Sequence, residues 1–196
     1  MPCGNRCRLA FVQIKEKIKT AAVDPAAFLL YHYDIRFLSM RCSKPKPRAQ
    51  RRKHMEKLLI SACLLGVSCR YDGKSKPLDG IEKLMDKYEL VPVCAEIMGG
   101  LSTPRDPAEI VGEKVLTEKG KDVTAQYIKG AEEVLRLGRL FGCKKALLKE
   151  KSPSCGSGMI HNGKFDGGLI KGFGKTAALL LENGFEVFGE SEIGKL

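Results

Sequence analysis

The sequence lacks any hydrophobic run that approaches the ~20 residues a membrane-spanning helix needs. Its longest apolar stretches, Ala26–Tyr31 and Ala177–Leu181, have the length of core segments. A secretory signal is not expected either, because no adequate apolar region precedes a small-residue cleavage site. Hydrophobic residues nevertheless make up 43% of the 196 residues, which is enough for a buried core and excludes wholesale disorder. We therefore expect a cytoplasmic protein with no membrane partner.

Acidic residues are scarce in one part of the chain. Residues 1–54 contain 13 Lys or Arg and only 3 Asp or Glu, a net charge of +10, while the whole chain carries +11. Residues 55–196 hold the other 21 basic (34 − 13) and 20 acidic (23 − 3) residues. We expect a single domain at 55–196 and a basic N-terminal extension at 1–54, either disordered or not native, with Met55 as the alternative start. A native extension would suit nucleic acid or act as a transit-type leader.

Histidine is nearly absent from the expected domain, where His161 is the only one. It stands beside Asn162-Gly163, a turn signature. We therefore expect His161 to be a solvated surface residue, and any proton transfer to fall to carboxylates.

Short apolar runs alternate with segments of helical periodicity along residues 55–196. The apolar runs predict strands at Lys57–Ala62, Leu90–Val93, Lys145–Lys149 and Phe185–Phe188. Helical spacing predicts helices at Ile81–Tyr88, at Thr124–Phe141 with Thr124 as N-cap, and at Thr176–Asn183. Hairpins are expected at Glu109–Leu116 and Met159–Phe165. The alternation predicts an α/β fold, with a mostly parallel sheet flanked by helices in three Rossmann-like layers.

Three cysteines stand where predicted strands end. Cys63 and Cys94 directly follow strands, and Cys155 comes six residues after one. Ligands of open parallel sheets bind outside the carboxyl ends of the strands, so we expect these three thiols to meet at one edge. A disulfide framework is a poor explanation for a domain of this size without a secretory signal. Cys143 precedes its strand and is expected to be a small buried side chain.

Two kinds of metal centre suit such a set of thiols. Zinc would need four ligands, with Cys69 as the fourth. An iron–sulfur cluster on three thiolates would leave one iron open to a substrate. The spacings of 31 and 61 residues match no compact ferredoxin motif, so spacing alone leaves both centres open.

Seven short segments, in order along the chain, resemble those of a bacterial and archaeal family long catalogued as a domain of unknown function. They are SACLLG at 61–66, RYDG at 70–73, VPVCAE at 91–96, GGLSTPR at 99–105, GKDVT at 120–124, SPSCG at 152–156 and GFGKTAALL at 172–180. Characterised members are thiouracil and 4-thiouridine desulfidases. The resemblance covers about residues 57–196, leaves 1–54 without a counterpart, and has Ala95 where the family commonly has proline. It implies an α/β fold with an oxygen-sensitive 4Fe–4S cluster on Cys63, Cys94 and Cys155.

Five polar residues are candidates for the chemistry beside such a cluster. Glu96, two residues after a ligand cysteine, is expected to activate water or protonate the ring nitrogen. Ser152 is expected to orient the substrate or water next to it. Substrate contacts are expected from Asp72, Arg105 and Ser154, with Arg105 as an anion or base-stacking contact. Each has a structural alternative, which is a surface role for Arg105 and capping or turn formation in its loop for the other four.

The resemblance implies iron–sulfur-dependent hydrolytic removal of sulfur from a thiolated pyrimidine, with sulfide released through the open iron. The substrate would be thiouracil, 4-thiouridine, its nucleotide or a thiolated tRNA, and the oligomeric state is not determined. The alternative is a metal-stabilised nucleic-acid-binding module without turnover, which would use the basic extension. Sulfur transfer in the biosynthetic direction is a third interpretation.

Overall fold

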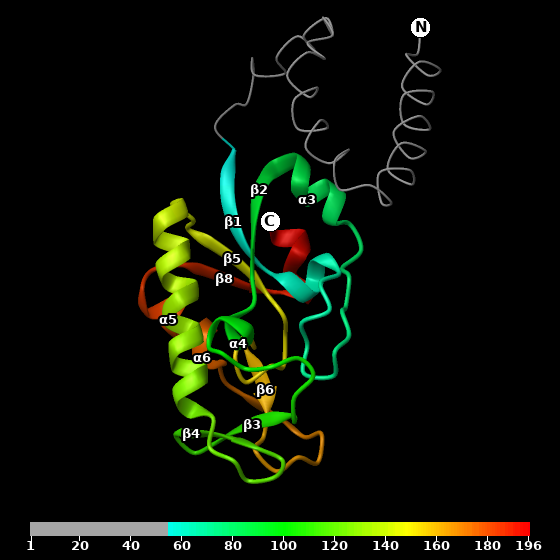
Figure 1. The fold of residues 1–196 in the computed structure, drawn as a ribbon. Coiled ribbons are helices and arrows are strands. Elements are labelled where there is room, and N and C mark those ends of the chain that lie inside the picture. Colours follow the sequence, from blue (N-terminus) through cyan, green and yellow to red (C-terminus); the bar gives the residue numbers. More distant parts are fainter. Residues whose placement is uncertain (1–54) are drawn as a thin grey trace, which may run out of the picture. The chain divides into compact units, whose positions relative to one another are not determined.

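The computed structural model describes residues 55–196, and the predicted extension at 1–54 lies outside the described residues (Figure 1). The centre of the described part of the chain is a four-stranded sheet in the order β2-β1-β5-β8, in which all neighbouring strands are parallel. The strands are β1 (Glu56–Ser61), β2 (Tyr88–Val93), β5 (Lys145–Leu148) and β8 (Glu186–Gly189). The predicted mostly parallel α/β sheet is therefore confirmed.

The central strand β1 shows why the sheet is covered on both faces. Leu58, Leu59 and Ile60 are all fully buried, although successive side chains of a strand point to opposite faces. Leu59 packs in a cluster with residues of α5 (Thr124–Phe141) and α6 (Lys175–Glu182). Leu58 and Ile60 pack on the other face.

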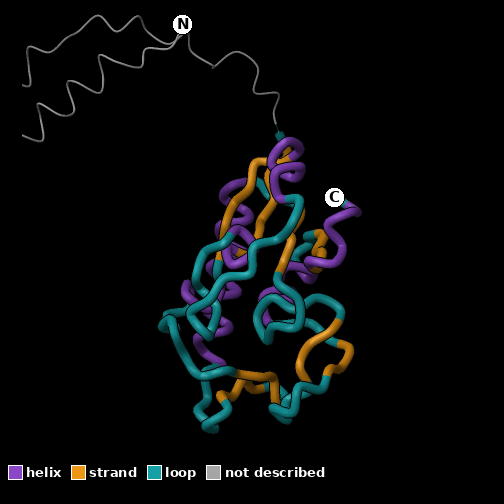
Figure 2. Tube along the Cα trace, turned by 90° about the vertical axis from the view of Figure 1, so that its right-hand side faces the viewer, coloured by secondary structure: helices purple, strands orange, loops and turns teal. Residues whose placement is uncertain are grey.

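The second face is covered by α3 (Ile81–Lys87) and by the C-terminal 3-10 helix η2 (Glu190–Lys195). Leu84 of α3 and Ile193 of η2 belong to the same hydrophobic cluster as Leu58 and Ile60. Figures 1 and 2 show the sheet between these two layers of helices. The three-layer arrangement is therefore the predicted one.

Several local predictions differ from the structure in detail. The strand predicted to begin at Leu90 begins at Tyr88, and it tolerates Pro92 because β2 is an edge strand. Val123 is the N-cap of α5, and the Thr124 hydroxyl instead accepts the N–H of Val115 at 2.9 Å. Residues after Cys94, expected to be a loop, form the short helix α4 (Ala95–Met98).

Two hairpins lie beyond the carboxyl ends of the sheet strands (Figure 1). The first pairs β3 (Ala108–Val111) with β4 (Lys114–Thr117), close to the predicted position. The second pairs β6 (Met159–His161) with β7 (Leu169–Lys171), so the predicted hairpin at Met159–Phe165 was wrong in its second strand. Residues 162–168 form the connecting loop instead. Both hairpins therefore lie at the edge of the sheet where the parallel strands end.

The strand order positions a site between β1 and its neighbours. From β1 the chain passes to β2 on one side, and it later returns to β5 on the other side. Such a switch point opens a crevice outside the carboxyl ends of the strands. The 3-10 helix η1 (Ala62–Leu65) follows β1 directly at this crevice. Among residues 55–196, no helix has both the length and the apolar character to span a bilayer.

Candidate functional site

A cavity of about 320 Å³ lies at the carboxyl edge of the sheet, and all three predicted ligand cysteines line it. Cys63 is in η1 after β1, Cys94 is the N-cap of α4 after β2, and Cys155 is in the loop after β5. Because β1 pairs with both β2 and β5, the ends of the three strands converge. Cys69 lines the same cavity. The sequence expectation that the thiols gather at one edge agrees with this arrangement.

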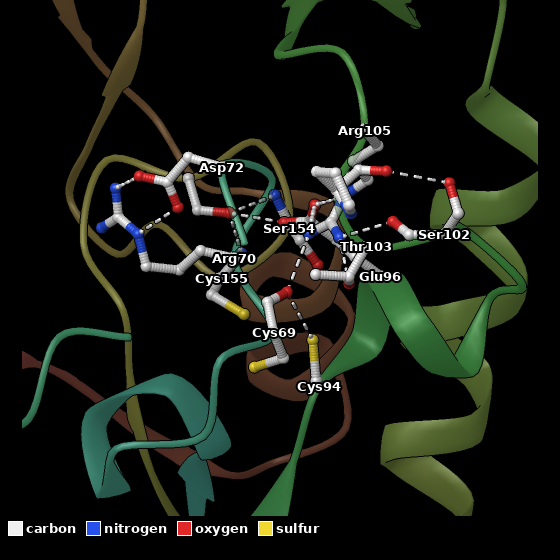
Figure 3. Close-up of polar contacts among 12 residues, drawn as sticks. Cys69, Arg70, Asp72, Cys94, Glu96, Ser102, Thr103, Arg105, Ser154 and Cys155 are labelled. Atoms are coloured by element: carbon white, nitrogen blue, oxygen red, sulfur yellow. Dashed lines mark hydrogen bonds and ion pairs between the residues drawn. The ribbon is translucent and has the colours of Figure 1, made fainter. Parts of the chain in front are cut away.

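The four thiols of the cavity influence one another. Cys94 donates through Sγ to the carbonyl oxygen of Cys69 at 3.9 Å (Figure 3). Burial, helped by the neighbouring Cys94, raises the pKa of the Cys63 thiol, and the same causes raise the pKa of Cys69 to about 12. Burial also raises the pKa of Cys155 well above its usual range. Metal binding at these thiols would therefore have to displace protons.

The carboxylate of Glu96 is held in the first turn of α4 by Arg105. Arg105 Nε donates to Glu96 Oε2 at 2.8 Å, and Arg105 Nη2 donates to the same oxygen at 2.5 Å (Figure 3). The two side chains are only 8% and 16% exposed, so solvent screens this pair weakly. Arg105 also donates to the backbone oxygens of Cys69 at 3.2 Å and Ser102 at 3.0 Å. These contacts leave Glu96 Oε1 as the carboxylate oxygen that Arg105 does not contact.

Ser152 connects Glu96 Oε1 to the loop that carries Cys155. Its hydroxyl donates to Glu96 Oε1 at 3.4 Å. The Oγ of Ser152 in turn accepts the N–H groups of Ser154 at 3.1 Å and Cys155 at 3.2 Å. Glu96, Arg105 and Ser152, which were candidates from sequence, therefore lie together on one wall of the cavity.

Two other sequence candidates do not reach the cavity wall. The Asp72 carboxylate accepts two hydrogen bonds at 3.1 Å from Arg70, and the Arg70 guanidinium lowers the pKa of Asp72. Arg70, and not Asp72, lines the cavity. Ser154 is fully buried, and its hydroxyl pairs with that of Thr176 at 2.9 Å. Any effect of Asp72 or Ser154 on a substrate would therefore pass through another residue.

Several residues of the cavity wall were missed from sequence. His161, expected to be a solvated surface residue, keeps 36% of its side chain exposed but also lines the cavity, because it belongs to strand β6 and not to the following turn. Glu109 of β3 and Tyr127 of α5 also line the cavity. Burial, together with the nearby Glu96, raises the pKa of the Tyr127 hydroxyl well above its usual range. Tyr127 was recognised only as part of an apolar helical stripe, a pattern that does not reveal where its hydroxyl lies.

Cys143 serves as the internal comparison for the other cysteines. It is 5% exposed and packs in the hydrophobic cluster between the sheet and helices α5 and α6. It does not line the cavity. The expectation of a small buried side chain is therefore confirmed.

Comparison with known proteins identifies a family and two similar proteins. Residues 58–192 match the model of the 2-thiouracil desulfurase family. The uncharacterized protein YbbK of Bacillus subtilis (strain 168) is 43% identical over 149 residues, which cover 71% of this chain and 99% of YbbK. A solved structure of the 4Fe–4S-dependent thiouracil desulfidase TudS is 50% identical, with a TM-score of 0.69 over 72% of this chain and 95% of that one.

Proposed function

The chain belongs to the 2-thiouracil desulfurase family, and from this we propose that it removes sulfur from a thiolated pyrimidine with a 4Fe–4S cluster bound by Cys63, Cys94 and Cys155. The observation that carries the proposal is the cavity in which these three thiols meet the Glu96–Arg105–Ser152 network.

The thiols of the described residues suit a cluster better than a single metal ion. Within residues 55–196, no three His, Cys, Asp or Glu side chains form a group that could hold one metal ion. The cysteines of a cluster bind different iron atoms, so they surround a larger volume than the ligands of one zinc ion. The three cysteines instead line a cavity of about 320 Å³. When bound, the cluster would supply a thiophilic Lewis acid with one iron not bound by cysteine.

The overall reaction is a hydrolysis. The thiocarbonyl carbon loses sulfur and gains the oxygen of water, so the thiobase and water yield the oxo-base and hydrogen sulfide with no net redox change. The protein must therefore bring a water to the thiocarbonyl carbon and remove its proton.

Glu96 is the residue we assign to this proton. Its Oε2 is occupied by Arg105, so Oε1 accepts the proton of the attacking water as a general base. Ser152, which donates to Oε1 at 3.4 Å, orients the water or the ring beside it. Its backbone contacts to residues 154 and 155 fix the hydroxyl relative to the cluster loop.

The remaining sequence candidates act as positioning residues in this proposal. The guanidinium of Arg105 already donates to Glu96, to two backbone oxygens and to the Thr103 hydroxyl. It therefore holds the base in place. Asp72 positions Arg70 on the cavity wall, and Ser154 anchors its loop to α6 through Thr176.

Anaerobic reconstitution with iron and sulfide tests the proposal. We expect a brown protein that absorbs near ~400 nm, as thiolate-bound clusters do. It should release sulfide and the oxo-base from a member of a panel of 2-thiouracil, 4-thiouracil, 4-thiouridine, its monophosphate and thiolated tRNA. Replacing Cys63, Cys94 or Cys155 with Ala should abolish the absorbance, whereas Cys143→Ala, the matched control, should keep it.

Other outcomes of this experiment would favour the alternatives. A colourless protein that is isolated with zinc and retains it would contradict the cluster. RNA binding without desulfurization would favour the nucleic-acid-binding module. That alternative depends on the basic residues 1–54, which lie outside the described residues.

A further inference from the structure

A second polar group lies on the cavity wall, separate from the Glu96 network. It consists of Glu109 on β3 and His161 on β6, and we call it the hairpin pair because each residue comes from one of the two hairpins. The proposed proton transfer uses neither residue.

Glu109 is a buried carboxylate with only one oxygen bonded. The residue is 8% exposed, and its Oε2 accepts the N–H of Gly163 at 2.8 Å and of Phe165 at 3.2 Å. These bonds tie Glu109 to the loop of the other hairpin and fix the orientation of the carboxylate. Within residues 55–196, no side chain or backbone group donates a hydrogen bond to Oε1, and no lysine or arginine pairs with Glu109.

His161 provides a second polar atom without a partner. Its Nδ1 is buried and has no hydrogen-bond partner among the described residues. The nearest acidic atom is Glu109 Oε1 at 3.9 Å, which is too far for a hydrogen bond. The hairpin pair therefore presents one acceptor, Glu109 Oε1, at the cavity, while His161 Nδ1 lies 3.9 Å from it and is closed off from solvent.

Buried polar atoms normally have partners, because an unsatisfied one costs free energy. Glu96 illustrates the usual solution, since Arg105 and Ser152 occupy both of its oxygens. At the hairpin pair, Glu109 Oε1 is not closed off from solvent, and its missing partner comes from what occupies the cavity. A carboxylate without a cation repels anions and accepts from N–H groups, so the partner is a neutral donor rather than a phosphate.

We propose that the hairpin pair binds the amide edge of the pyrimidine ring, where an N–H donor and a carbonyl acceptor stand side by side. Glu109 Oε1 accepts the ring N–H, and His161, whose Nδ1 lies 3.9 Å from that oxygen, is a positioning residue beside the carboxylate. This inference rests on the proposed function and names the part of the substrate that is recognised. It makes the hairpin pair a specificity determinant for rings with a free N–H.

Binding of uracil, the oxo-product of thiouracil, tests the hairpin pair without turnover. Calorimetry on the anaerobic, cluster-loaded full chain should show Kd for uracil raised about 10- to 100-fold by Glu109→Gln, since hydrogen bonds to charged groups have that strength. His161→Phe should raise Kd about tenfold or less. Glu113→Gln, the same change at an exposed position in the turn of the β3–β4 hairpin, should leave Kd unchanged.

Methylated ligands distinguish recognition from a structural role. With the wild-type chain, either 1-methyluracil or 3-methyluracil should bind about 10- to 100-fold more weakly than uracil, because methylation removes the recognised N–H. In Glu109→Gln the same methylation should cost less than about threefold.

A Glu109→Gln variant that weakens all three ligands by the same factor would show that Glu109 only supports the loop. That result would overturn the inference, as would a wild-type chain that binds no uracil. Absence of sulfide release with this binding pattern intact would contradict the proposed function and leave the inference standing.

Discussion

Helices α4 and α5 touch through their backbones, and this contact controls where Glu96 lies. Gly130 of α5 packs against the carbonyl of Ala95, so that a Cβ added there would lie 2.7 Å from the carbonyl carbon and closer still to its oxygen. Gly99 makes the reciprocal contact, with an added Cβ at 2.9 Å from the carbonyl carbon of Gln126. Figure 1 shows α4 beside α5. We therefore predict that Gly130→Ala damages the site although it lies outside it.

The expected loss of stability and of rate follows from how far the added methyl group would overlap the backbone of Ala95. Carbon atoms pack best at about 3.5–4.0 Å, so α4 must shift by about 1 Å to admit the new methyl group. Helix propensity alone would stabilise Gly130→Ala by about 0.5–1 kcal/mol, whereas overpacking costs about 1–3 kcal/mol. We expect a net loss of about 1–2 kcal/mol. Ala95 separates Cys94 from Glu96, so the shift displaces both, and a 1 Å misplacement can cost about 100-fold in rate.

Sulfide release from 2-thiouracil by the reconstituted variant measures the rate, and thermal unfolding followed by circular dichroism measures the stability. Gly138→Ala in the same helix is the matched control. Its Cβ would meet Leu59 Cδ1 and the Phe185 ring at 2.9 Å, which are core side chains that can adjust. We expect Gly138→Ala to keep kcat within about threefold. The reasoning is refuted if Gly130→Ala is as stable and active as the wild type, or if both variants lose the same activity.

Three further predictions concern other parts of the chain. Ser154→Ala should cost about 1–2 kcal/mol, because it leaves the buried Thr176 hydroxyl without its partner, while KM stays unchanged; a raised KM would instead support the substrate contact expected from sequence. In cluster-free protein the pKa of Cys69 is about 12 instead of the ordinary 9.0. At pH 8, Cys69 therefore has roughly 1000-fold less thiolate than a cysteine with the ordinary pKa. Its alkylation by iodoacetamide, followed by mass spectrometry, should therefore be slow and rise about tenfold per pH unit from 8 to 10, and a rate equal to that of the unfolded chain would contradict the assignment. A chain that starts at Met55 should retain full turnover of 2-thiouracil, and lost activity would show that residues 1–54 take part.

The sequence by itself determined the α/β architecture and the gathering of the cysteines. Runs such as Leu58–Ile60 are apolar at every position, which is the pattern of a strand buried on both faces. Because parallel strands end at the same edge, Cys63, Cys94 and Cys155 could be placed together without knowing the strand order. Glu96 could be placed in the site because it stands two residues after Cys94 in the sequence.

Only the tertiary structure decided how the loops and hairpins meet at that edge. Ser152 and Ser154 are two residues apart in one motif, yet the loop turns Ser152 to Glu96 and Ser154 into the core against Thr176. Periodicity carries no information about such irregular backbone.

His161 shows the same limit over a longer distance. Its neighbours in sequence indicated an exposed turn, but β6 brings His161 to the cavity wall, and the loop of this hairpin is bonded to Glu109, more than fifty residues earlier. Local patterns record which face of an element is apolar, whereas contacts between distant loops depend on how the whole chain packs. The sequence therefore located the cysteines of the site, and the fold brought Glu109 and His161 to the wall of the same cavity.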